Sequence, residues 1–127
     1  MERSAITSYK DLKVWQDAMA LAEACYGETR AFPREEMFGL TAQIRRAATS
    51  VAANIAEGHG RETGGAFVQF LRVAQGSLKE LETHILLSGR VGLLTAPRAE
   101  SLLGRCEEIG KMLRALIRAL QKPEGNR

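Results

Sequence analysis

The chain has 127 residues, of which 45% are hydrophobic and 26% are charged, and these proportions are ordinary for a soluble globular protein. This length favours one domain, residues 1–127, with enough apolar side chains to bury a core. No apolar stretch approaches the roughly 20 residues that a membrane span needs, and residues 1–15 lack the apolar core of a secretory signal. These exclusions predict a cytoplasmic protein.

The net charge is +3, and the positive charge is concentrated towards the C-terminal end. Residues 1–36 carry 5 basic and 7 acidic side chains, a net charge of −2, whereas residues 109–127 carry 5 basic and 1 acidic, a net charge of +4. A mildly basic chain is weak evidence for a nucleic-acid partner by itself. The uneven distribution is more informative, because it concentrates cations on one segment.

The first predicted helix covers residues 9–31, where apolar side chains recur three and four positions apart. Phe32-Pro33 ends it, because the residue before a proline avoids helical backbone angles. The seam that we expect to face the core consists of Leu12, Trp15, Met19, Ala22, Tyr26 and Thr29. A second apolar stripe flanks this seam and consists of Val14, Ala18, Leu21 and Cys25.

The second predicted helix covers residues 40–57 and ends at Gly58-His59-Gly60, since glycine tolerates the left-handed cap that often follows a helix. Its core-facing seam consists of Leu40, Ile44, Ala47, Val51 and Ile55. The opposite arc should be polar if it faced water. Instead it is built mostly from small residues, namely Ala42, Thr49, Ala53 and Ala56, with charge at Arg46 and Glu57.

Two further helices are predicted over residues 64–89 and 96–121, and residues 122–127 are expected to fray. The seam of the third helix is Phe67, Leu71, Ala74, Leu78, Leu81, Ile85 and Ser88, and beyond it lie Val68, Phe70, Val73, Leu86 and Leu87. The seam of the fourth is Ala99, Leu102, Cys106, Ile109, Leu113, Leu116 and Leu120. Short connections make neighbouring helices antiparallel, so we expect an all-α, up-down-up-down four-helix bundle.

A single bundle core does not cover all of this apolar surface, so we expect a homo-oligomer. The fourth helix is different, because its outer arc is charged and ordinary for a face in water. The residues predicted at the contact between copies are Val14, Leu21, Ala42, Thr49, Ala53, Ala56, Phe70, Val73 and Leu87. The alternative is a monomer with a wide core and some exposed alanine, which is common.

The residue types and spacings that catalysis needs are missing. The two histidines, His59 and His84, are not part of the paired Glu-x-x-His motifs of a di-iron bundle. Residues 58–65 are rich in glycine but follow a helix and lack the ending of a phosphate loop. Cys25 and Cys106 form no metal motif, and we expect reduced, buried thiols. We therefore predict no enzyme activity, no metal and no cofactor.

Basic side chains are the remaining candidates for a binding site. The candidate contacts to nucleic acid are Arg45, Arg46, Arg61, Arg72, Lys111, Arg114, Arg118 and Lys122. The last four are spaced 3, 4 and 4 residues apart and form one ridge, although cations near a helix C-terminus also have a purely stabilising role. Arg45 has a second interpretation, an ion pair with Glu57 or Glu80 of a neighbouring copy. Asn54 is expected to form a hydrogen bond across the bundle.

Ten short motifs resemble those of a known family, the small bacterial four-helix-bundle proteins of the 23S rRNA intervening-sequence type, which are related to the accessory variability proteins of diversity-generating retroelements. The motifs are Tyr9-Lys10-Asp11-Leu12-Lys13-Val14-Trp15, Phe32-Pro33, Gly39-Leu40-Thr41, Gln43-Ile44-Arg45-Arg46-Ala47, Asn54-Ile55-Ala56-Glu57-Gly58, Gly60-Arg61, Phe70-Leu71, Ala74, Gly76-Ser77 and Glu80-Leu81-Glu82. They fall within residues 9–92. The fourth helix resembles the family only in its pattern.

The resemblance implies an antiparallel bundle assembled as a homopentamer, with no known enzyme activity. Its retroelement relatives present a basic surface and bind a reverse transcriptase and nucleic acid, whereas the function of the intervening-sequence type is unsettled. Two positions depart from the family pattern. The family often has Ser-Ile-Pro-Ser-Asn where this chain has residues 50–54 without proline, and it usually has an aromatic residue at the position of His59.

Two functions from different classes agree with the sequence. The first is a non-enzymatic oligomeric scaffold whose basic surface engages RNA, DNA or a nucleic-acid-processing protein. The second is a protein–protein interaction adaptor that binds no nucleic acid, with its arginines serving as ion pairs at interfaces.

Overall fold

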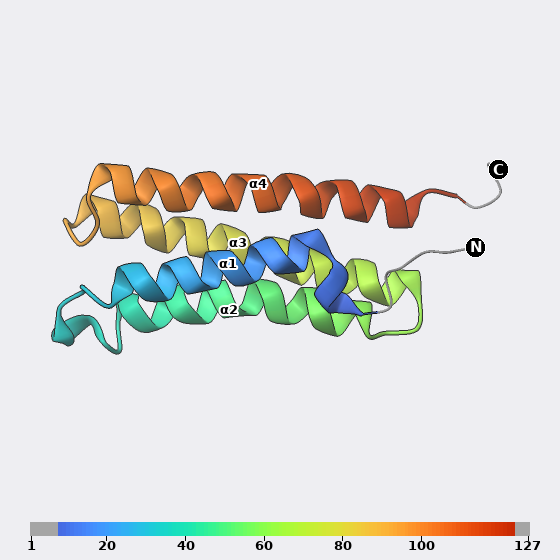
Figure 1. Ribbon diagram of the computed structural model, residues 1–127, viewed down its shortest axis with the longest axis horizontal. Helices are drawn as coiled ribbons and strands as arrows, with labels where there is room; N and C mark the ends of the chain where they lie inside the picture. The colour runs from blue at the N-terminus through green and yellow to red at the C-terminus, as the bar shows by residue number, and fades with distance from the viewer. Residues whose placement is uncertain (1–7, 124–127) are drawn as a thin grey trace.

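The computed structural model describes residues 8–123, and within this range it contains four long α-helices and no strand. The helices are α1 (Lys13–Thr29), α2 (Leu40–His59), α3 (Gly64–Arg90) and α4 (Ala96–Gln121), and short 3-10 turns lie at Tyr9–Asp11 and Arg34–Glu36. In Figure 1 the four helices lie side by side along the long axis of the molecule, and the chain reverses direction from each helix to the next. The prediction of an all-α, four-helix fold is confirmed.

The helix ends follow from hydrogen bonds that the sequence supplies locally. Thr63 and Thr95 precede α3 and α4, and each hydroxyl accepts a hydrogen bond from the backbone N–H three residues ahead, at 3.1 and 3.4 Å. A carboxylate oxygen of Glu36 accepts from the N–H of Leu40 at 3.0 Å and caps α2. Gly92, with a φ of 84°, adopts the left-handed conformation that turns the chain after α3. Most of the expected tail, residues 124–127, lies outside the described residues.

The first predicted helix, residues 9–31, is divided in the structure. Leu12 has an extended backbone between the first turn and α1, with φ −77° and ψ 125°. The side-chain amide of Gln16 donates a hydrogen bond to the carbonyl oxygen of Lys10 at 2.8 Å and holds this turn against the helix. The turn also places the ring of Tyr9 edge-on to Trp15, with 5.1 Å between the ring centres. The spacing of apolar residues does not reveal this break, because Leu12 and Trp15 keep the three-residue spacing of a helix although Leu12 itself is extended.

The buried face of α1 is the predicted flanking stripe together with Thr29, the one buried member of the predicted seam. The side chains that α1 buries are Val14, Ala18, Leu21, Cys25 and Thr29, whereas Met19 and Tyr26 of the predicted seam are 40% and 41% exposed. Both stripes have helical spacing, but the buried one contains the smaller side chains, which let α1 approach α2 and α4 closely. The prediction that Val14 and Leu21 contact another copy is wrong, because both are buried inside their own subunit.

Close packing between α2 and α3 depends on small residues of α2. Gly58 is buried, and a Cβ atom added there would lie 2.7 Å from the Cβ atom of Phe70 and 2.9 Å from a ring carbon of Phe67. About two turns closer to the start of α2, the hydroxyl oxygen of Ser50 lies 2.7 Å from that of Ser77 on α3, and this hydrogen bond links the two helices. Most residues of the predicted seams of α2 and α3 are buried, as predicted.

We predict that Gly58→Ala destabilises the fold by about 1–3 kcal/mol, because the added methyl group has to displace the packed ring of Phe67 or the helix that carries it. Gly104→Ala is the matched control, since nothing lies within 4 Å of a Cβ atom at Gly104. This second change should stabilise the protein by about 0.5–1 kcal/mol through helix propensity. Urea unfolding followed by circular dichroism measures both, and equal stability of the two variants would contradict this account of α2–α3 packing.

Candidate nucleic-acid interface

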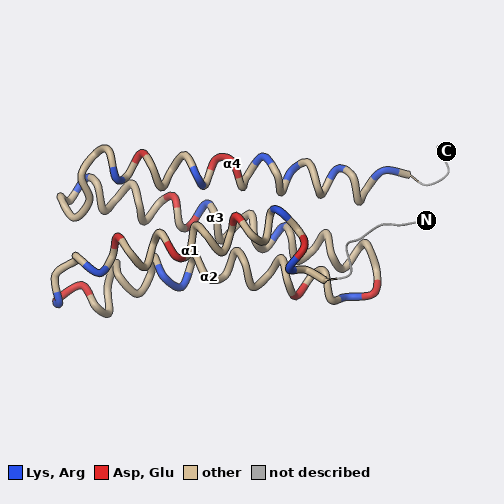
Figure 2. The backbone as a smooth tube through the Cα atoms, in the orientation of Figure 1, with Lys and Arg blue, Asp and Glu red and all other residues tan. Residues whose placement is uncertain are grey.

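The charge on α4 changes sign along the helix. Figure 2 shows both acidic and basic positions in the half of α4 that begins at Ala96, whereas the charged positions in the half that ends at Gln121 are all basic. The predicted ridge occupies this second half, and its four members are exposed, namely Lys111, Arg114, Arg118 and Lys122. Lys111 lies 3.7 Å from Glu108 in an exposed ion pair, which contributes little to stability.

A hollow between α3 and α4 joins Arg72 to this ridge. The residues that line it are Arg72, Gln75, Gly76, Leu78, Lys79, Gly110 and Arg114. Three of these side chains are cationic and none is acidic. Lys79 also pairs with Glu82 on its own helix at 3.1 Å, whereas Arg72 and Arg114 form no ion pair within residues 8–123. Of the predicted basic residues, the structure therefore brings together Arg72 and Arg114.

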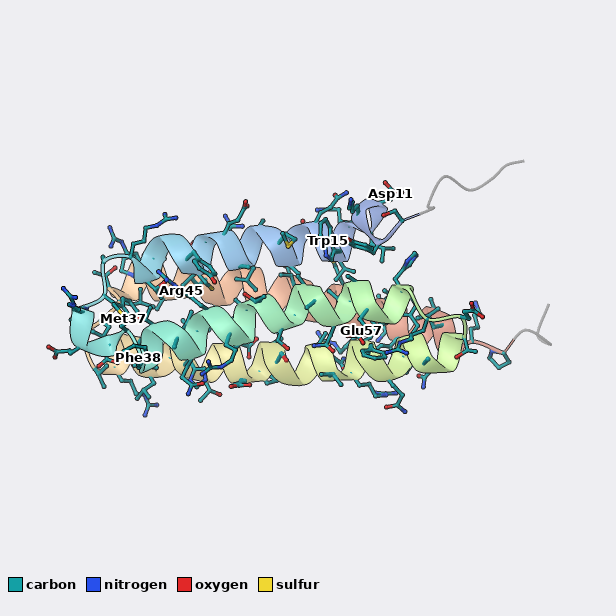
Figure 3. The ribbon with its side chains drawn as sticks, turned by 90° about the horizontal axis from the view of Figure 1, so that it is seen from below. Asp11, Trp15, Met37, Phe38, Arg45 and Glu57 are labelled. Atoms are coloured by element: carbon teal, nitrogen blue, oxygen red, sulfur yellow. The ribbon has the colours of Figure 1, made fainter. Side chains whose placement is uncertain are left out.

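Arg45 serves the bundle itself. Its Nε donates a hydrogen bond of 2.9 Å to the hydroxyl oxygen of Thr29, and its guanidinium lies over the ring of Tyr26, 4.5 Å from the ring centre. Figure 3 shows Arg45 of α2 at the boundary with α1, the helix to which both partners belong. These contacts fix α1 against α2, and they make Arg45 a structural residue of the subunit.

Arg46 lies on α2 and Arg61 in the turn between α2 and α3, so neither belongs to α4 or lines the hollow between α3 and α4. Arg46 is exposed on the outer side of α2 and forms no ion pair within the described part of the chain. Arg61 pairs with Glu57 at 2.9 Å and covers the ring of Phe70, 4.8 Å from its centre. Glu57, predicted as a partner for Arg45 of another copy, thus has an ion pair within its own subunit.

An apolar groove runs along the boundary between α1 and α2, with a volume of about 680 Å³. The residues that line it are Tyr9, Trp15, Met19, Ala22, Glu23, Tyr26, Arg30, Thr49, Ala52, Ala53 and Ala56. Thr49, Ala53 and Ala56 had been predicted at a contact between copies. Trp15, Met19 and Tyr26 were predicted on the core-facing seam, so the groove that they form was not predicted.

The other predicted contact residues are divided between the surface and the interior. Val73 and Leu87 are 51% and 45% exposed on α3, and Ala42 is half-buried on α2. Phe70 is half-buried against Gly58. Phe38, which was not predicted at any contact, is 91% exposed and lies in the turn before α2 at one end of the bundle (Figure 3).

Comparison with known proteins identifies the family. The model of the 23S rRNA-intervening sequence protein family matches residues 10–115. The chain belongs to this family. Among solved structures it is similar to a protein of unknown function from the S23 ribosomal protein family of Bacteroides thetaiotaomicron, with 26% sequence identity and a TM-score of 0.74 over 82% of this chain and 97% of that one. No curated protein matches the sequence.

Membership of the 23S rRNA-intervening sequence protein family confirms the resemblance that the motifs indicated. The match to the family also extends into α4 as far as residue 115, whereas the motifs ended within α3. It therefore includes Arg114, but it does not reach the last two cations of the ridge.

Asn54, a member of one of the family motifs, was predicted to form a hydrogen bond across the bundle, and the structure makes this link indirectly. Its side-chain amide donates to the carbonyl and hydroxyl oxygens of Ser50, at 2.8 and 3.0 Å. Ser50 in turn contacts Ser77 on α3. The crossing residue is thus Ser50, and Asn54 fixes the position of its hydroxyl group.

The groups with catalytic potential are dispersed in this member of the 23S rRNA-intervening sequence protein family. His84 lies 3.4 Å from Glu80 in an exposed pair, and the ring of His59 packs edge-on against Phe67. No group of three His, Cys, Asp or Glu side chains in residues 8–123 is arranged to hold a metal ion. None of the helices in that range combines the length and the apolar character needed to cross a membrane.

Both cysteine thiols are buried, and burial raises the pKa of each from 9.0 to about 12, because a thiolate loses its hydration there. A neighbouring charge makes a smaller contribution in each case, from Arg105, which lowers the pKa of Cys25, and from Glu82, which raises the pKa of Cys106. Both thiols are free. Neither has the lowered pKa of a catalytic nucleophile.

We predict that Arg45→Ala lowers the free energy of unfolding by about 1–2 kcal/mol, since it removes a hydrogen bond and a cation–π contact between α1 and α2. Arg46→Ala is the control on the adjacent position, and it should stay within about 0.5 kcal/mol of the original chain. Urea midpoints compare the two. A loss of stability as large in the control as in Arg45→Ala would show that Arg45 has no special structural role.

We predict that neither thiol reacts quickly with a disulfide reagent near pH ~8 while the chain is folded, whereas both react after denaturation. Between pH 9.0 and about 12 the unfolded chain loses thiol protons that the folded chain retains. Stability should therefore fall as the pH rises through this window. Fast labelling of either cysteine in the native protein would contradict the burial.

Proposed function

We propose that this protein is a non-enzymatic oligomeric scaffold, built from antiparallel up-down-up-down bundles, that presents a basic surface to nucleic acid or to a ribonucleoprotein. The supporting observation is the separation of two surfaces on one subunit. An apolar groove lies between α1 and α2, and unpaired cations lie on α3 and α4. A concave surface lined mainly by apolar and aromatic side chains is typical of an interaction site, and clustered cations attract a polyanion.

Self-association covers the apolar surface in this proposal. The α1–α2 groove carries Trp15 and Met19, while α3 exposes Val73 and Leu87 on a different surface. Two unlike patches favour a heterologous contact, in which each copy offers one patch to the next, and such contacts form a ring when the rotation closes. The family resemblance implies five copies.

Repetition strengthens the basic surface. One subunit supplies a short row of exposed cations, which holds a polyanion only weakly at physiological salt. A ring repeats the row in every copy, so a ligand that reaches several rows gains affinity without any new type of contact. The proposal assigns no reaction and no cofactor to this surface, because its residues are cations and small polar groups.

We predict that the intact protein scatters light as a particle several times heavier than the 13.9 kDa chain. Ala53→Arg should reduce the mass to that of one chain, since Ala53 lines the apolar groove and a long cationic side chain blocks a neighbour there. Ala115→Arg makes the same change on the exposed side of α4 and should keep the assembly. A folded single chain in the unaltered protein would contradict self-association.

The same three proteins test the basic surface. The assembled forms should retain RNA or DNA in a gel shift near ~50 mM salt and release it as salt rises, whereas the single-chain variant should bind more weakly. Assembled protein that binds neither RNA nor DNA at low salt would refute the nucleic-acid function and leave the adaptor function in its place.

A further inference from the structure

We propose that the hollow between α3 and α4 is a phosphate site that holds the backbone of a double-helical nucleic acid, with the ridge of α4 continuing the contact. This inference rests on the proposed function and goes beyond it in two ways. It places the ligand on one groove of the subunit, and it selects a duplex over a single strand. The hollow and the ridge together are called the α3–α4 basic groove below.

The hollow concentrates positive charge. Arg72, Lys79 and Arg114 line one hollow, and no carboxylate is among its lining residues. Like charges brought together disfavour one another unless an anion lies between them or water screens them. Lys79 has Glu82 beside it. Arg114 also lines the adjoining hollow that contains Glu82 and Glu107, but neither Arg72 nor Arg114 forms an ion pair within residues 8–123. A guanidinium is well suited to bind a phosphate, because its N–H groups form paired hydrogen bonds with phosphate oxygens.

Two glycines, Gly76 and Gly110, keep the groove open. Nothing lies within 4 Å of a Cβ atom placed on Gly76 of α3. On the facing helix, a Cβ atom placed on Gly110 would lie 3.5 Å from a terminal nitrogen of Arg114. The guanidinium of Arg114 therefore lies back over Gly110 at the hollow, where a side chain extended into water would not be. A phosphate group has room between the helices and a donor already in place.

The remaining cations of the ridge extend from the hollow towards the end of α4. Arg118 and Lys122 follow Arg114 at intervals of four residues, so they continue along the same side of α4. From Lys111 to the end of α4 at Gln121 the helix rises by roughly 15 Å, and Lys122 follows as the C-terminal cap. At about 3.4 Å per nucleotide along one strand of a duplex, this length matches about four to five nucleotides. Closer to Ala96, the exposed residues that precede Lys111 on α4 include Glu100 and Glu107. Their negative charge limits the contact to the half of α4 that ends at Gln121.

The absence of aromatic side chains from the α3–α4 basic groove favours a duplex over a single strand. Proteins that hold single strands without sequence preference combine cations with aromatic side chains on which bases stack. α4 contains no Phe, Tyr or Trp, and none lines the hollow. The aromatic residues Tyr9, Trp15 and Tyr26 lie instead along the α1–α2 groove. A surface with cations alone recognises the phosphates and shape of a double helix and does not read its bases.

The main test compares two double variants with equal loss of charge. Arg72→Gln with Arg114→Gln removes the two arginines of the hollow, and Arg34→Gln with Arg90→Gln removes two exposed arginines at the opposite end of the bundle. The probes are a mixed-sequence RNA duplex, the DNA duplex of that sequence and one RNA strand, each titrated by fluorescence anisotropy across a salt series. Circular dichroism and light scattering confirm that both variants fold and assemble as the unaltered protein does.

We expect the hollow variant to lose about tenfold or more in affinity for either duplex, and the slope of log affinity against log salt to become shallower by about two units for each subunit in contact. The control should keep its slope. Equal losses in both variants would overturn the site, because the effect would then follow net charge alone. Tighter binding of the single strand than of either duplex would overturn the choice of a duplex and leave the scaffold function intact.

A second pair of variants tests the hollow by filling it. Gly76→Glu puts a carboxylate into the open space beside Arg72, and Gly104→Glu makes the same change at an equally unobstructed position nearer the start of α4. The first change should abolish duplex binding, and the second should weaken it much less. Comparable binding by the two would overturn the site. If the unaltered, assembled protein binds none of the probes, the proposed function fails together with this inference.

Discussion

The close approach of α2 to its neighbours is the constraint on which the rest of the subunit depends. Small side chains permit it, and the tightest point is Gly58, which has no room for one further carbon atom against Phe67 and Phe70. Helices that pack this closely gain many van der Waals contacts at once, because each contact is weak but their number is large. Small residues also occupy the outer side of α2, at Thr49 and Ala53. A surface helix usually carries long charged side chains on this side.

The position of α1 follows from this packing and creates the α1–α2 groove. When the stripe with Ala18 and Cys25 is buried, the larger residues on the neighbouring stripe, such as Trp15 and Met19, are left at the rim. Arg45 holds this arrangement from the side of α2 through Thr29 and Tyr26. A groove with an apolar floor and aromatic walls is thus a direct consequence of how the core is filled, and it faces away from the basic half of α4.

Much of the fold could be predicted because it depends on short-range signals. Glycine, proline and threonine mark the helix ends, and the apolar spacing of residues 64–121 predicts the buried faces of α3 and α4. For α1 the signal was ambiguous, since two stripes have the same period and only the volume of Ala18 and Cys25 separates them. The role of Arg45 was not predictable either, because its partners lie 16 and 19 residues earlier and meet it only after folding. Charge along α4 identified the ridge, but the pairing of Arg72 with Arg114 required the contact between two helices.

The order of charges on α4 has a consequence for the helix itself. The backbone dipole of a helix leaves partial negative charge at its C-terminal end, and cations there stabilise the last turns. Arg118 lies in the last turn and Lys122 is the cap residue that follows it, so the side chains that attract a polyanion also stabilise the end of α4. A bound anion would shield that end of the helix from these cations at the same time as it orders them. The stability of the last turns of α4 and the binding of an anion beside them are therefore coupled, and both depend on ionic strength.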